Sequence, residues 1–191
     1  PVPSYISTPG EKVIKGANNT WLVFGRDRLQ SRLSGYGGRG DTQAGSMDIV
    51  VGRLGSYGKS FEEDGQRSWV DPSVKYDAAR IYISQKTDID ENFYLADGKV
   101  GNAKTKSGIA LKADGIRIVA REGIKLITRT DAINSQGGEI AEAAGIDLIA
   151  TNNDEDLQPI AKGENLRESL EQLTEHVSKL NGIVDSLLMY Q

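Results

Sequence analysis

Short runs of apolar residues, separated by glycine-rich segments, mark the first half of the chain. Residues 21–24 and 47–51 form two such runs, each bounded by polar or glycine residues. Around Ile81 and Ile83 apolar and polar residues alternate, which places both isoleucines on one face of an extended strand. Short strands joined by many turn residues are typical of all-β folds. We therefore expect residues 19–100 to form a small, loop-rich β domain.

A short phrase of a glycine, an apolar, a polar and an apolar residue recurs after this domain. Copies begin at Gly108, Gly115 and Gly123, and a fourth begins at Gly145 after an interruption. The first three starts are seven and eight residues apart, which is enough for one short strand and one tight turn. In an extended chain the second and fourth residues of each copy point to one face. These inward-facing residues are Ile109, Leu111, Ile116, Ile118, Ile124, Leu126, Ile146 and Leu148.

One chain cannot enclose a core with such narrow strands, because a single apolar stripe would stay half exposed. A solenoid built by one chain generally needs about 18 or more residues to go round three faces. The repeat here has only seven or eight residues, so three chains would each supply one face. We therefore expect residues 101–151 to form a short-repeat β-helix shared by a homotrimer.

A heptad pattern follows near the C-terminal end. Its apolar residues are spaced four and three apart in alternation over seven core positions, which is typical of a coiled-coil helix. We expect this helix to span residues 164–191, after a polar and acidic linker at residues 152–163 that contains Pro159. The seam residues are Leu166, Leu170, Leu173, Val177, Leu180, Val184 and Leu187.

The heptads alone leave the number of chains open. Valine at two a positions with leucine at d leans towards a dimer. Ile183, Leu188 and Tyr190 widen the apolar face, as expected when more helices or another protein must be covered. The short repeats need three chains, so we choose the trimer. The alternative is one amphipathic helix folded against its own domain.

The first residues are rich in turn formers. Pro1, Pro3 and Pro9 cannot donate to a strand ladder, so residues 1–18 are expected to form an extended N-terminal arm. Such an arm either lies on a neighbouring subunit or is a frayed terminus. With these parts the chain is mainly β: a small N-terminal β domain, a trimeric β-helix and a C-terminal α-helical coiled coil.

Composition narrows the class of protein. The 191 residues include 22 glycines but 3 phenylalanines, which favours an elongated β protein over a compact enzyme core. There are no cysteines, so disulfides, thiolate metal sites and a cysteine nucleophile are excluded. The formal net charge of -4 argues against general nucleic-acid binding. No apolar run approaches the roughly 18 residues of a membrane span, and no export signal is evident, so we expect no membrane association.

No cluster of side chains suggests catalysis or a bound cofactor. The lone His176 lies beside the heptad seam without a ligand-spaced companion, so we expect it on a surface or at an interface. Asp88, Asp90, Glu91 and Asp97 lack the spacing of a calcium loop and are expected to be solvated carboxylates. We therefore predict a protein that is not an enzyme and has no cofactor, metal ion or catalytic residues.

A glycine-rich segment and a basic segment each allow a functional and a purely structural explanation. The glycine-rich residues 34–46 contain Arg39-Gly40-Asp41, the integrin tripeptide, and faintly resemble a phosphate loop, but they lack its lysine spacing, so we expect a plain loop. Residues 103–129 carry seven Lys/Arg against two acidic residues, which would attract phosphate, lipopolysaccharide or nucleic acid. Outward residues of a β stack must also be polar, and we favour that explanation.

The rhythm of the four glycine-led copies resembles the octapeptide-type repeats of intertwined triple-stranded β-helices, as in contractile-tail spikes of phages and in type VI secretion spikes. The resemblance covers about residues 101–150, a quarter of the chain, and residues 131–144 depart from it. The phrase QPIAKGENL before the terminal helix is similar to the C-terminal ends of tailed-phage virion proteins.

This resemblance implies a structural component of a phage or phage-like particle. The chain would form a homotrimeric spike, fibre or decoration that docks through its N-terminal β domain onto other virion structural proteins. It would reside in the virion after assembly in the host cytoplasm. The alternative is a host-surface glycan-binding fibre tip or depolymerase module, although a depolymerase is expected to need a wider solenoid with carboxylates along a groove.

Overall fold

The computed structural model describes residues 2–29, 43–142 and 144–190. The chain divides into two compact units, Pro1–Glu155 and Asp156–Gln191. Arg39-Gly40-Asp41 and most of the surrounding glycine-rich loop lie outside the described residues.

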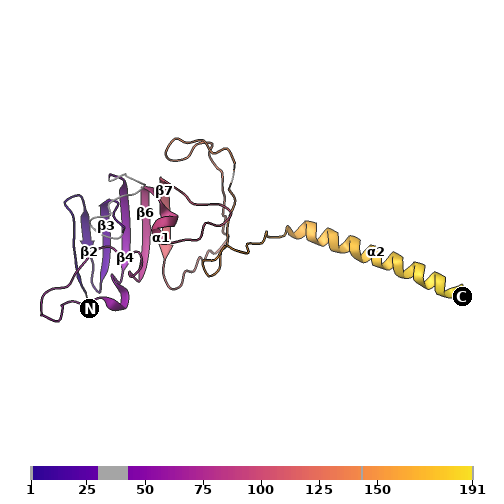
Figure 1. Ribbon diagram of the computed structural model, residues 1–191, viewed down its shortest axis with the longest axis horizontal. Helices are drawn as coiled ribbons and strands as arrows, with labels where there is room; N and C mark the ends of the chain where they lie inside the picture. Colours follow the sequence, from indigo (N-terminus) through magenta and orange to yellow (C-terminus); the bar gives the residue numbers. More distant parts are fainter. Residues whose placement is uncertain (1, 30–42, 143, 191) are drawn as a thin grey trace. The chain divides into compact units, whose positions relative to one another are not determined.

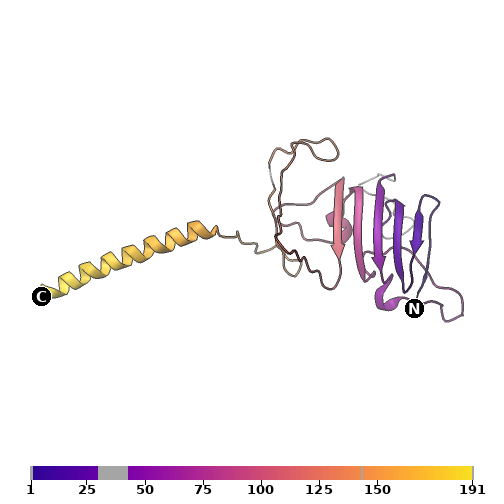
Figure 2. The ribbon, with the colours of Figure 1, turned by 180° about the vertical axis from the view of Figure 1, so that it is seen from behind.

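A five-stranded antiparallel sheet forms the centre of the first unit (Figures 1 and 2). The predicted strands at residues 21–24, at residues 47–51 and around Ile81 are confirmed. In spatial order the strands are β2 (Lys12–Lys15), β3 (Thr20–Arg26), β4 (Gly45–Val51), β6 (Ala79–Thr87) and β7 (Lys106–Lys112).

Smaller elements surround this sheet. The strands β1 (Ser4–Tyr5) and β5 (Trp69–Val70) pair in parallel as a second, two-stranded sheet. A short 3-10 helix, η1 (Gly55–Tyr57), follows β4, and a five-residue helix, α1 (Ile89–Phe93), follows β6. The second unit holds one long helix, α2 (Gly163–Met189).

The N-terminal stretch packs on its own chain, so the prediction of an extended arm over residues 1–18 is wrong. Tyr5 is buried in β1, and β2 is a full member of the large sheet. Arg28 holds this stretch in place: its guanidinium donates to the Tyr5 hydroxyl at 2.7 Å, to the Ile6 carbonyl and to the Glu11 carboxylate. The prolines indicate only that some backbone positions cannot donate strand hydrogen bonds. They give no sign that Arg28, later in the sequence, binds this stretch.

The large sheet buries its more polar face. Arg80, Tyr82 and Ser84 of β6 are buried, whereas Ile81 on the opposite face is 39% exposed. The two isoleucines of β6 share a face, as predicted, but their face is the outer one. Buried polar side chains are tolerated here because they are paired: Arg80 lies 2.9 Å from Asp77 and 3.1 Å from Asp48.

The core of the unit lies beneath this polar face. Tyr5, Trp21, Val23 and Val50 form one cluster of buried side chains, and Leu29, Val74 and Tyr82 form a second. The Arg53 guanidinium, itself fully buried, stacks over the Tyr5 ring at 4.2 Å and adds a cation–π contact to the first cluster.

The acidic residues after β6 organise the chain between α1 and β7. Asp88 accepts a hydrogen bond from the backbone N–H of Thr105 at 2.6 Å, and Asp90 accepts one from that of Ala103 at the same distance. These two carboxylates therefore accept hydrogen bonds from the backbone, whereas the sequence led us to expect carboxylates that only contact solvent. They fix the entry of the chain into β7.

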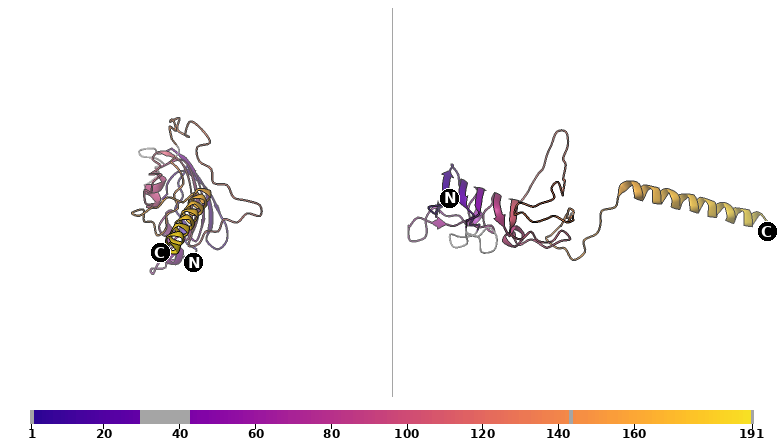
Figure 3. Two further views of the ribbon diagram at one scale, coloured as in Figure 1. Left: turned by 90° about the vertical axis from the view of Figure 1, so that its right-hand side faces the viewer. Right: turned by 90° about the horizontal axis from the view of Figure 1, so that it is seen from above.

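The first copy of the repeat belongs to the large sheet. Gly108–Leu111 lies within β7 and pairs with β6, so the sheet extends past the domain boundary predicted at residue 100. After β7, residues 113–142 and 144–162 form no strand, and no β-helix is seen in the described part of this single chain (Figures 1 and 3). The chain is therefore mixed, with sheets and one long C-terminal helix, and the prediction of a mainly β protein is confirmed only in part.

Candidate assembly interface

The repeat copies after β7 leave their apolar side chains in solvent. Six of the predicted stripe residues have exposures between 46 and 71%, although such residues are normally covered in a folded protein. These six are Ile116, Ile118, Ile124, Leu126, Ile146 and Leu148. Ile109 and Leu111 of β7 are also more than half exposed.

The backbone of the same segment lacks a strand partner. Among the described residues after β7, the main exception is a small hairpin in which Ile133 forms a bridge with Glu139. In this hairpin the Asn134 N–H donates to the Gly138 carbonyl at 2.8 Å. The copies at Gly115 and Gly123 form no ladder in the described chain. An extended segment with a free backbone and an apolar stripe is a template for pairing with other chains.

The fourth copy is fastened to the chain before β7. The Asp147 carboxylate accepts backbone N–H groups of Lys99 and Val100 at 2.6 and 2.8 Å. Asp154 accepts the N–H of Gly98 at 2.8 Å. These hydrogen bonds join the two ends of the segment that carries the copies at Gly115 and Gly123. They form without any pairing between those copies.

The heptad seam of α2 is uncovered. None of the residues of α2 is buried, and the seven seam residues from Leu166 to Leu187 have exposures between 45 and 64%. The ion pairs of the helix lie off the seam: Arg167 bridges to Glu171 at 2.6 Å, and Lys179 bridges to Glu175 at 2.7 Å. This division of charged and apolar positions is typical of a helix whose seam packs against other helices.

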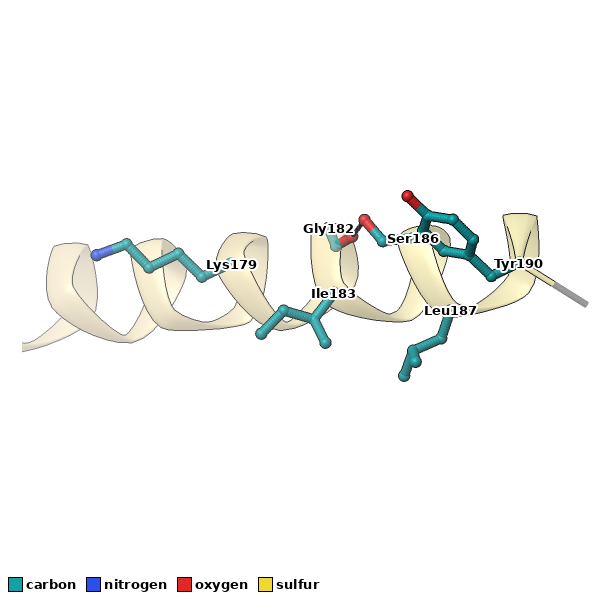
Figure 4. A pocket seen from close by; sticks show the side chains of 6 residues that line it. All are labelled: Lys179, Gly182, Ile183, Ser186, Leu187 and Tyr190. Carbon is teal, nitrogen blue, oxygen red and sulfur yellow. Dashed lines mark hydrogen bonds between the residues drawn. The ribbon is translucent and has the colours of Figure 1, made fainter.

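A shallow groove marks the C-terminal half of α2 (Figure 4). Ile183 and Leu187 point to the same side of the helix, while Tyr190 projects from its last turn. Gly182 has no side chain and leaves the surface hollowed there, and the Ser186 hydroxyl donates to its carbonyl at 2.7 Å. Because only one helix bounds this groove, it fits the side chains of an adjacent helix better than an enclosed small molecule.

Exposed apolar residues also occur outside the predicted stripe. Val119 and Ile127 are 88 and 69% exposed, and each directly follows a stripe residue, so their side chains turn to the opposite face of an extended chain. The sequence indicates these additional apolar residues, because each of these two copies ends in two consecutive apolar residues. Further exposed residues lie on the outer face of the large sheet, including Ile49 and Val51.

The described residues hold neither a metal-binding cluster nor a membrane-spanning helix. Among residues 2–29, 43–142 and 144–190, no three His, Asp or Glu side chains stand together in a way that could hold a metal ion. His176 lies on α2 with an exposed side chain. No helix in the described part of the chain combines the length and the apolar character needed to cross a bilayer.

Asp27 is a buried carboxyl of the core with a raised pKa. Its Oδ2 accepts hydrogen bonds from the Tyr82 hydroxyl at 2.5 Å and from the Ser84 hydroxyl at 2.8 Å. Burial raises the pKa of Asp27 to about 6, and these hydrogen bonds only partly oppose that effect. The Tyr82 hydroxyl also lies within hydrogen-bond distance of the Thr87 hydroxyl, at 2.9 Å. The hydrogen bonds to Asp27 join β6 to the chain that follows β3 within the core.

Comparisons of the chain with protein-family models, with curated proteins and with solved structures give no match. The role of the protein must therefore be inferred from its own sequence and geometry.

Proposed function

We propose that this chain is a structural component of a phage or phage-like particle, in which three copies assemble into a homotrimeric spike, fibre or decoration. The observation that carries the proposal is the segment after β7, where regularly spaced apolar side chains are exposed and the backbone of the copies at Gly115 and Gly123 has no strand partner among the described residues. Two further copies of the chain would supply apolar side chains that cover the stripe and strands that pair with its backbone.

The α2 helix supports the same proposal independently. Its seam keeps a heptad spacing and is exposed along its whole length. An isolated helix of this kind is marginal in water and gains its stability by packing its seam against partner helices. On the trimer proposal, α2 is the C-terminal coiled coil that follows the β-helix.

The compact β domain supplies the attachment. It has its own core and a network of buried ion pairs, which suits a part that holds the chain on a particle. We propose that it docks onto other virion structural proteins and that the protein resides in the virion after assembly in the host cytoplasm. The resemblance of the repeats to spike β-helices supports this location.

The role on this proposal is mechanical and not catalytic. Intertwined strands bury their backbone on all sides, and separating them requires all three chains to open together, which slows unfolding. Such kinetic stability suits a part of a particle that persists outside a cell. The alternative role as a glycan-binding fibre tip or depolymerase has no observation among the described residues in its favour.

A pair of adjacent substitutions tests the proposal. Ile124→Asp places a charge on the stripe, and Lys125→Asp places the same charge on the next residue, which points to the other face. On the proposal, Ile124→Asp makes the trimer dissociate at a lower denaturant concentration than Lys125→Asp does, as measured by light scattering on the full chain. Equal dissociation midpoints for the two variants would contradict the proposed interface.

A further inference from the structure

The outer face of the large sheet is apolar across all five strands. Residues directly opposite one another in neighbouring strands share a face. One row on this face therefore runs without a break through Ile14, Leu22, Ile49, Ile81 and Leu111. Its neighbouring row runs through Phe24, Met47, Ile83 and Ile109, with Lys12 at the β2 end.

Exposed large apolar side chains are concentrated on this face. Seven of its large apolar residues have exposures between 37 and 67%. The largest apolar patch of a typical monomer measures roughly 300–600 Å² and is often functional. Among the strand residues of this face, the charged ones are Lys12 on the edge strand and Arg26 at the end of β3. Because its centre is uncharged, the face can lie against identical faces without bringing like charges together.

The face is also continuous with the repeat stripe. Ile109 and Leu111 are the second and fourth residues of the first copy, and both lie on this face of β7. A hollow of about 310 Å³ joins the two surfaces: Val51 and Ile81 line it from the sheet, and Ile116 of the second copy lines it from the other side. The stripe of the repeats therefore begins on the sheet itself.

We propose that the outer face of the large sheet is a trimer interface, covered by the same faces of two further copies of this chain. This inference rests on the proposed trimer and extends it from the repeats and α2 to the β domain. If the second and fourth residues of each repeat copy point to a common axis, then Ile109 and Leu111 point to it too. The face to which they belong must then turn to that axis, and the three sheets enclose a shared apolar core.

A second copy fits this face for a further physical reason. The opposite face of the sheet is covered by the chain's own clusters and buried arginines, so the domain is complete on that side. In the described part of the chain the apolar residues of the outer face stay exposed, and a symmetric trimer would cover the same patch on every copy at once. Docking to another particle component would then use the remaining surfaces of the domain.

The absence of cysteine from the chain makes a direct test possible. Single-cysteine variants of the full chain report one position each when treated with a water-soluble maleimide. Val51→Cys and Ile81→Cys place the thiol on the outer face, and Tyr57→Cys places it on η1, where Tyr57 is 70% exposed and off the sheet. The mass of each variant is measured by light scattering in the same solution, and its fold by circular dichroism.

In the trimer, the thiols at positions 51 and 81 should react about tenfold or more slowly than the thiol at position 57, because reaction requires local opening. All three should react alike in denaturant. Equal rates in a trimeric sample would overturn this inference and leave the trimer standing. Protection that appears only in assembled particles would assign the face to a particle component and likewise overturn it. A monomeric mass for the unmodified chain would overturn both proposals.

Discussion

Ile81 of β6 lies directly opposite Leu111 of β7, and both side chains are exposed on the outer face of the large sheet. The first belongs to the β domain and the second to the first repeat copy. Their pairing joins two regions that the sequence pattern separates. The apolar surface of the domain and the apolar stripe of the repeats are thus one surface, and whatever covers one also approaches the other.

Asp27 makes the stability of the β domain depend on pH in an unusual direction. Its pKa is about 6 in the folded chain and ordinary in the unfolded chain, so the folded state binds the proton more tightly. The contribution of Asp27 to the free energy of unfolding therefore falls as the pH rises from about 4 to about 6 and is constant above that range.

We expect the unmodified chain to gain about 1 kcal/mol over an Asp27→Asn variant between pH 7 and pH 5, because the variant cannot take up this proton. Urea unfolding of both proteins at equal concentration measures the difference. The comparison cancels the titration of groups that do not interact with Asp27, so a difference that does not change with pH would contradict the assignment.

Asp77 holds two buried arginines. Its carboxylate lies 2.9 Å from the Arg80 guanidinium and 3.5 Å from that of Arg53, and it also accepts the Leu54 N–H at 2.9 Å. Removing one partner of a buried pair leaves the other charge uncompensated. We expect Asp77→Asn to lower the free energy of unfolding of the β domain by about 3 kcal/mol or more, measured by urea unfolding.

An exposed pair on α2 provides the control for this prediction. Glu164 and Arg167 are 3.0 Å apart, but both side chains are more than half exposed. Exposed ion pairs contribute little to stability, so Glu164→Gln should leave the unfolding of the β domain unchanged. Equal effects of the two substitutions would show that the buried network does not stabilise the domain.

The α2 seam is expected to start assembly. Val177 occupies an a position of the heptad, and Ser178 lies next to it on the outer side of the helix. Val177→Asp should therefore slow the appearance of trimer after refolding, while Ser178→Asp should not. The time course is measured by light scattering after dilution from denaturant. If both variants assemble as fast as the unmodified chain, α2 does not nucleate the trimer.

The sequence predicts those parts of the fold that depend on local pattern. The strand around Ile81, the strand at the first repeat copy and the C-terminal helix all follow from period-two or heptad spacing. The anchor of the N-terminal stretch was missed because Arg28 is distant in sequence from Tyr5, and no local pattern links them.

Hydropathy also could not predict which face of β6 is buried, again because the cause lies in distant residues. Arg80 is buried only because Asp48 and Asp77 meet it from other parts of the chain. Ile81 is exposed among the described residues, which hydropathy alone does not predict. The copies at Gly115 and Gly123 form no strand in the described chain, although their pattern predicts strands there. On the proposed trimer their strand partners come from the other chains.

The mass of the full chain in solution tests the central claim most directly. Multi-angle light scattering at micromolar concentration should give three times the 20.7 kDa of one chain, and the value should persist on dilution because intertwined chains separate slowly. A mass equal to that of one chain would contradict the proposed trimer, the shared β-helix and the sheet interface together.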